Sequence, residues 1–186
     1  KLIQNHMRNF ISKLKGLLKK DTKKDDEFFV LEIIEKIIPA NPIIIEAGAH
    51  IGSDSGRFAE LWKSAIIYAF EPVPEVYSQL VENTSKYTNI KTIPLALSDR
   101  NGTTEMYVSS GRSDASSSLL APKKHLEVHP DVAFNKTISV ETVTLDTFAE
   151  KNNIKHIDFM LLYMQGYELP MIMASQILIN DFTLIY

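Results

Sequence analysis

Two apolar runs, each with a carboxylate at its end, constrain the fold of this chain most strongly. The first, Ile43 to Ala47, leads into a loop with glycines at positions 48 and 52. The second, Ala65 to Phe70, is followed directly by Glu71. Short apolar runs that alternate with helical patterns are typical of buried parallel strands. The glycines indicate a tight strand-to-helix turn, because a backbone without Cβ can turn sharply and let a ligand approach closely.

The spacing of these residues favours S-adenosylmethionine over a dinucleotide as the ligand. Glu46, Gly48 and Gly52 form a pattern with one glycine fewer than the dinucleotide motif G-x-G-x-x-G. Glu46 would attract an ammonium group and repel a diphosphate, and Glu71 could accept both hydrogen bonds of a ribose diol. In the alternative interpretation, the glycines only shape the turn and Glu46 is a solvated cap.

The composition fits a single domain in a reducing compartment. With 186 residues, of which 45% are hydrophobic, the chain can form one sizeable core but not two. It contains no cysteine, which is compatible with the cytoplasm. No apolar run approaches the roughly 18 to 20 residues of a membrane span. We therefore expect a cytoplasmic protein.

Basic residues are concentrated at the start of the chain. Of 20 basic residues, eight lie in residues 1–24 beside a single acid, which leaves 12 basic against 22 acidic residues in the remainder. The acidic remainder is unsuited to gripping nucleic acid. Apolar residues recur at helical spacing in the basic arm, so residues 1–20 could contact a membrane surface peripherally, bind a partner groove or pack on their own domain.

The order of elements predicts an α/β domain preceded by a helical extension. We expect helices at residues 28–38, 53–63, 74–87, 145–152 and 167–175. We expect strands at residues 43–47, 65–70, 91–97, 103–108, 137–144, 157–163 and 182–186. Residues 1–40 then form the N-terminal extension, and residues 41–186 form a mostly parallel sheet covered by helices. The intervening residues 109–136 lack periodicity, which is typical of a lid or a binding loop.

Several motifs together resemble the FkbM family of methyltransferases that use S-adenosylmethionine. The resemblance runs from about residue 41 to residue 186 and rests on IEAGAHIG (45–52), FEP (70–72), ALSDRNG (96–102), SSSL (116–119), VTLDT (143–147) and the block QGYE (165–168). It implies a seven-stranded, Rossmann-like class I sheet and a hydroxyl acceptor, often on a glycan or a small metabolite. Because the sequence stops inside the fifth expected strand, either it is a fragment or the sheet is truncated there; the edge of a truncated sheet would be covered by another segment or by a partner chain, such as a second copy in a homo-oligomer.

The resemblance assigns roles to individual residues. The expected cofactor ligands are Glu46, Gly48, Ala49 and Gly52 at the methionine half, Glu71 at the ribose, and Ser98 with Asp99 at the adenine. In the family, the fourth strand ends in Asp-x-[Glu/Gln]-Gly, with the aspartate beside the transferring methyl group. Here that position is Tyr163, and Gln165, Gly166 and Glu168 remain of the motif.

Tyr163 is a poor base at neutral pH, so another group must take the acceptor proton. His125, His129, Asp114 and Glu168 are candidates, although a loop histidine is more often a solvated surface residue and Glu168 can simply cap a helix. The spacing of Asp114, His125 and His129 is not a recognisable metal-ligand set, so no metal is expected.

Two other functions remain open. Tyr163 and the early chain end would also suit a non-catalytic module that binds S-adenosylmethionine or acts as a scaffold, and we expect slow transfer or none. An oxidoreductase that uses NAD is disfavoured by the glycine spacing and by the lack of a clear Tyr-x-x-x-Lys pair within one helix.

Overall fold

The computed structural model describes residues 31, 33–111, 117–121, 132–176 and 182–186. The chain divides into two units, residues 1–39 and 40–186. In the first unit, helical residues are found at 31, 33 and 34, and turns follow. The amphipathic helix expected at residues 1–20 lies outside the described residues. Within the described part of the chain, every helix is too short or too polar to span a membrane.

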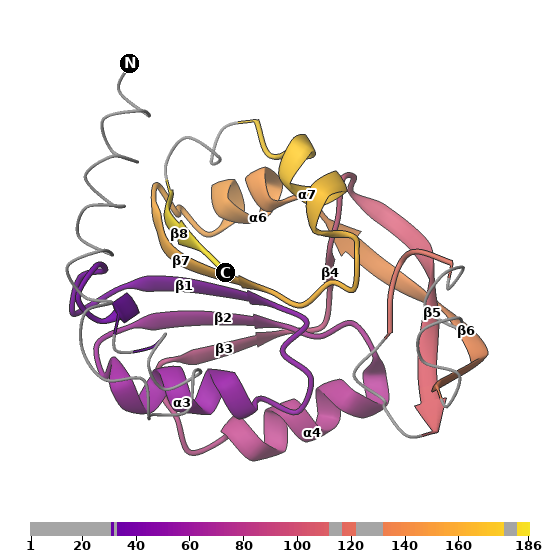
Figure 1. Ribbon diagram of the computed structural model, residues 1–186, viewed down its shortest axis with the longest axis horizontal. Coiled ribbons are helices and arrows are strands. Elements are labelled where there is room, and N and C mark those ends of the chain that lie inside the picture. Colours follow the sequence, from indigo (N-terminus) through magenta and orange to yellow (C-terminus); the bar gives the residue numbers. More distant parts are fainter. Residues whose placement is uncertain (1–30, 32, 112–116, 122–131, 177–181) are drawn as a thin grey trace. The chain divides into compact units, whose positions relative to one another are not determined.

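A parallel five-stranded sheet forms the centre of the second unit. Its strands are β1 (Ile43–Ala47), β2 (Ile66–Phe70), β3 (Ile90–Ile93), β7 (Ile157–Leu162) and β8 (Phe182–Ile185), in the order β3-β2-β1-β7-β8. Helices α3 (Ser53–Leu61) and α4 (Pro74–Thr84) cover one face, and α6 (Leu145–Lys151) and α7 (Glu168–Ala174) cover the other (Figure 1). The predicted α/β fold with a mostly parallel sheet is confirmed.

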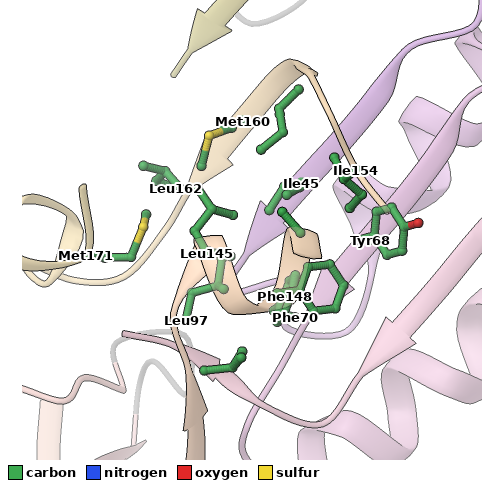
Figure 2. Packing of buried hydrophobic residues seen from close by; sticks show 14 residues of the cluster. Ile45, Tyr68, Phe70, Leu97, Leu145, Phe148, Ile154, Met160, Leu162 and Met171 are labelled. Atoms are coloured by element: carbon green, nitrogen blue, oxygen red, sulfur yellow. The ribbon is translucent and has the colours of Figure 1, made fainter. Parts of the chain in front are cut away.

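Aromatic side chains fill the core on both faces of this sheet. On one face, the ring of Phe148 from α6 packs edge-on against Tyr68 and Phe70 of β2, with centroid distances of 5.2 and 4.7 Å (Figure 2). On the other face, Phe58 of α3 packs edge-on against Phe159 of β7 at 5.5 Å. Because helices cover both faces, β1, β2 and β7 are mostly apolar rather than alternating, with Glu46 and Asp158 as their charged residues.

A second, three-stranded sheet lies beyond the carboxyl ends of β1, β2 and β3 (Figure 1). It contains β4 (Ala96–Leu97), β5 (Gly102–Gly111) and β6 (Val132–Val143), in the order β4-β6-β5. Strand β6 pairs parallel to β4 and antiparallel to β5.

The second sheet corrects two sequence predictions. The single strand expected at residues 91–97 is divided between the two sheets, and the break falls at Pro94, which has no amide hydrogen for a strand ladder. The expected loop at 109–136 is shorter, because β5 continues to Gly111 and β6 begins at Val132. Polar residues in these added parts of β5 and β6 obscure the alternation typical of a strand. The hairpin is therefore defined only by the pairing of two segments that are distant in the sequence.

The β1–α3 loop requires glycine at two positions. Gly48 and Gly52 have φ angles of 84° and 86°, in the left-handed region. A Cβ on Gly48 would collide with the backbone carbonyl oxygen of Tyr163, at the end of β7. A Cβ on Gly52 would lie 2.7 Å from side-chain methyl groups of Leu80 and Thr84 on α4.

Gly48→Ala is expected to lower the free energy of unfolding by roughly 3 to 5 kcal/mol, since left-handed strain adds to a collision with backbone that cannot rotate away. Gly52→Ala is the matched control, because its φ angle is the same within 2° but its neighbours are side-chain methyl groups. We expect it to lose about 2 kcal/mol. Urea denaturation measures both values, and equal losses would contradict the proposed collision.

Candidate active site

A cavity of about 380 Å³ opens at the carboxyl ends of the parallel strands. Its walls come from the ends of β1 and β2 and the segments that follow β1, β2, β3 and β7, together with β4 and β5 of the second sheet and residues 117–119. Strand β1 lies between β2 and β7, so the chain leaves β1 toward one side of the sheet and later returns on the other. Open parallel sheets bind their ligands at such a switch point.

Glu46 lies at the base of the cavity and is only 1% exposed. Its Oε2 atom accepts a hydrogen bond from the hydroxyl of Ser55, a fully buried residue of α3. Burial raises the pKa of Glu46 to about 8, while the Ser55 hydrogen bond opposes that shift and the charge of Asp54 adds to it. A cation placed beside Glu46 would favour its charged form, and the interpretation of Glu46 as a solvated cap is wrong.

The amides of the β1–α3 loop are engaged within the protein. The N–H groups of Gly48 and Ala49 both donate to the carbonyl oxygen of Phe70, at 3.0 and 2.8 Å. The N–H group of His50 donates to Glu71 at 3.0 Å, and that of Gly52 donates to Ala49 at 2.9 Å. These four amides therefore do not form the open cradle that a diphosphate would need.

Glu71 is fixed at the end of β2 by two backbone amides. Its Oε2 atom accepts from His50 at 3.0 Å, and its Oε1 atom accepts from Val73 at 2.9 Å. Burial raises the pKa of Glu71, and the two amide hydrogen bonds work in the opposite direction. Each carboxylate oxygen can accept more than one hydrogen bond. Glu71 can therefore hold its present orientation and still accept from a diol in the cavity.

The cavity is lined by three residues with acidic side chains. Glu46, Asp54 and Glu71 all contribute to its walls, and no lysine or arginine is found among its described lining residues. A wall of this kind attracts a cation and repels a phosphate group. The cavity is therefore electrostatically suited to a positively charged ligand.

The second sheet supplies an apolar wall. Val73 and Ala96 form a buried cluster with Met106 of β5 and Val140 of β6, and Val76 and Leu119 pack against it. All of these except Val140 also line the cavity. This wall offers a flat aromatic ring a place to bury its apolar faces.

The site residues predicted from the sequence separate into three groups. Those that line the cavity are Glu46, Gly48, Ala49, Glu71, Tyr163 and Gln165. Those that lie outside its lining are Gly52, Ser98, Asp99 and Glu168. Those outside the described residues are Asp114, His125 and His129.

The residues outside the lining have contacts of their own. Asp99 accepts hydrogen bonds from the hydroxyl groups of Tyr167 and Ser98, at 2.8 and 3.1 Å. Glu168 accepts from the N–H group of Met164 at 2.9 Å, which links the first residue of α7 to the loop that precedes the helix. Asp99 follows β4 of the second sheet, whereas the sequence predicted it at the end of the third parallel strand.

Sequence reasoning did not assign a role to several lining residues, including His50, Asp54, Met106 and Tyr167. His50 sits inside the recognised motif at 45–52 and Asp54 follows that motif by two residues, so the proximity of both to Glu46 was a usable signal. Met106 carried no such signal, because only the pairing of β5 with β6 brings it to the cavity. Among the described residues, no group of three or more His, Asp or Glu is arranged to hold a metal ion.

This chain is similar in sequence to known methyltransferases. The family model of the methyltransferase FkbM domain matches residues 46–186. The 2-O-methyltransferase NoeI of Sinorhizobium fredii (strain NBRC 101917 / NGR234) is 30% identical over 189 residues, which cover 99% of this chain and 75% of that protein. A crystal structure of a fibrillarin/Nop5p complex matches 31% of this chain and 28% of that chain, with 22% identity and a TM-score of 0.30. This structural match covers too little of the chain to bear on the topology described above.

The buried Glu46 should make the stability of the protein pH-dependent. The folded state keeps its proton up to about pH 8, whereas the unfolded chain loses it near 4.5. The contribution of this group to the free energy of unfolding is therefore fully present below pH 4.5 and decreases as the pH rises from 4.5 through 8. The total decrease approaches roughly 5 kcal/mol. Glu46→Gln keeps an oxygen for Ser55 and should remove this dependence.

Urea denaturation of the parent and of Glu46→Gln between pH 5 and 9 checks this expectation. Glu141→Gln, at an exposed position on β6, is the control and should follow the parent. Parallel pH profiles for the parent and Glu46→Gln would contradict the assignment of the buried proton to Glu46.

Proposed function

The chain belongs to the FkbM methyltransferase family, and we propose that it transfers a methyl group from S-adenosylmethionine to a hydroxyl group of a glycan or small metabolite. One observation carries the choice of cofactor. Three carboxylates line a cavity at the switch point of the sheet, without a lysine or arginine among its described lining residues. The relative named as a 2-O-methyltransferase supports an oxygen acceptor.

The cofactor matches the distribution of charge in the cavity. S-adenosylmethionine carries a sulfonium cation, an ammonium group and a carboxylate, so it is positively charged overall. Glu46, with Asp54 nearby, would pair with the ammonium group. A dinucleotide would instead bring a diphosphate to a loop whose amides at 48, 49 and 50 are already engaged.

Glu71 and the apolar wall match the adenosine half. The carboxylate of Glu71 is held by two amides and can accept the ribose hydroxyls, which is the role expected at the end of the second strand. Strand β2 lies between β1 and β3, so the segment after β3 is on the far side of Glu71 from Glu46. Leu95, Ala96 and Val76 line the cavity there and would contact the adenine.

The acceptor would enter from the end of β7. When bound, S-adenosylmethionine supplies a methyl group already activated by the sulfonium, so this chain has to hold the acceptor hydroxyl in line and take its proton. Tyr163 and Gln165 line the cavity on this side. Tyr163 is 43% exposed, so its ring occupies room at the mouth of the cavity where an aspartate would leave space.

Glu71→Ala is expected to weaken binding of S-adenosylmethionine by about 1.5 to 3 kcal/mol, the scale for losing hydrogen bonds to a charged group. Titration calorimetry measures this, with S-adenosylhomocysteine as a second ligand. Glu82→Ala removes an exposed carboxylate of α4 and should leave affinity unchanged. Binding of NAD without binding of S-adenosylmethionine would contradict the proposal.

Tyr163→Asp is expected to raise methyl transfer by about 10²- to 10⁴-fold, the usual contribution of a general base, because it introduces a carboxylate and opens room for the acceptor. The assay follows turnover of S-adenosylmethionine on a panel of glycans and hydroxylated metabolites. Tyr163→Phe keeps the ring and should stay as slow as the parent. Robust parent turnover that either substitution abolishes would show that Tyr163 itself acts in the transfer.

A further inference from the structure

The loop between β7 and α7, residues 163–167, has a strained backbone beside the cavity. Gln165 and Gly166 have φ angles of 54° and 97°, so two consecutive residues are in the left-handed region. A residue with a side chain keeps such a conformation only where surrounding contacts hold it. The loop residues that line the cavity are Tyr163, Met164, Gln165 and Tyr167.

The start of this loop is held by backbone and helix contacts. The N–H group of Tyr163 donates to the carbonyl oxygen of Ala47 at 2.8 Å, and that of Met164 donates to Glu168 at 2.9 Å. These hydrogen bonds fix the loop where it leaves β7. They do not involve the carbonyl groups at the strained turn itself.

Ser118, which is bridged to β5, holds the strained turn through its side chain. It is 6% exposed, and its hydroxyl lies 3.1 Å from the carbonyl oxygen of Gln165 and accepts the N–H group of Leu120 at 3.0 Å. Its backbone pairs in both directions with Tyr107 of β5, at 2.9 and 3.0 Å. The backbone of Ser118 is therefore fixed to β5, and its side chain extends from there to the β7–α7 loop.

Tyr167 holds the other end of the loop. Its hydroxyl donates to Asp99 at 2.8 Å, and the hydroxyl of Ser98 donates to the same carboxylate oxygen at 3.1 Å. The Tyr167 hydrogen bond lowers the pKa of Asp99, while burial and this same bond raise the pKa of Tyr167. At neutral pH the proton therefore stays on Tyr167, and the pair acts as a fixed tether.

We propose that Ser118 and Tyr167 are positioning residues for methyl transfer, because they hold the β7–α7 loop in the strained conformation that keeps Gln165 against the cavity where the acceptor would bind. This inference rests on the proposed function. Neither residue needs to touch the reacting atoms. The two tethers come from different segments, so each should contribute separately to the order of the loop.

The tests are Ser118→Ala and Tyr167→Phe, each of which removes one hydroxyl and leaves the side chain otherwise similar in shape. The matched controls are Ser175→Ala and Tyr77→Phe. Ser175 is 3% exposed and donates to Met171 at 3.0 Å, and the hydroxyl of Tyr77 lies 3.2 Å from that of Thr92.

Hydrogen exchange in peptides that cover residues 163–168 reports on the loop without an acceptor. We expect exchange there to be at least tenfold faster in both test variants and unchanged in both controls. The Kd for S-adenosylmethionine should stay within about threefold of the parent, while kcat on any acceptor in use falls at least tenfold. Parent-like exchange in both test variants would overturn the inference.

Asp99→Asn separates positioning from proton transfer, because it keeps an oxygen that can accept from Tyr167. Exchange and kcat close to those of the parent support a tether. Normal exchange with lost turnover would show that Asp99 takes part in the chemistry and would overturn the assignment. Failure of the parent to bind S-adenosylmethionine would refute the proposed function, whereas the exchange rates would still decide whether the tethers hold the loop.

Discussion

The close approach of Gly48 to the carbonyl group of Tyr163 brings β1 and β7 together at the point where the cavity opens. The N–H group of Tyr163 donates to Ala47 in the same contact, so the parallel ladder continues to the edge of the site. A side chain at position 48 would force these strand ends apart. Glu46 on β1 and Tyr163 just after the neighbouring β7 keep their places because no Cβ intervenes in this contact.

The site combines two buried carboxyl groups that are stabilised differently. Glu46 has one hydroxyl donor and a pKa of about 8, so its charge depends on what lies beside it. Glu71 has two backbone amide donors, which oppose the effect of burial on its pKa. Glu46 can therefore ionise when a cationic ligand binds beside it, whereas Glu71 is already oriented by its two amide donors. This difference follows from position, because Glu46 lies within a strand and Glu71 lies just beyond one.

Much of the fold could be predicted from local patterns. The bounds of β1 are those predicted, and Pro74 begins α4 in its first turn as expected. Glu46 and Glu71 could be assigned to a ligand site because each sits at the end of an apolar strand beside a turn. The strands expected at 103–108 and 137–144 are present within β5 and β6, but the division at Pro94, the extension of both strands and their pairing in a second sheet were missed, because pairing between distant segments leaves no local pattern. Met106 and Leu119 were missed for the same reason.

The sequence by itself determined the parallel sheet, the glycine turn and the pair of acidic strand ends. These depend on short-range rules: which residues can be buried on both faces, and where a backbone can adopt a positive φ. Only the tertiary structure decided that Asp99 binds Tyr167 and that Ser118 reaches Gln165, across 68 and 47 residues respectively. Hydrogen bonds between residues so far apart in the sequence depend on how the segments around the two sheets pack together. No local pattern of residue types specifies that packing.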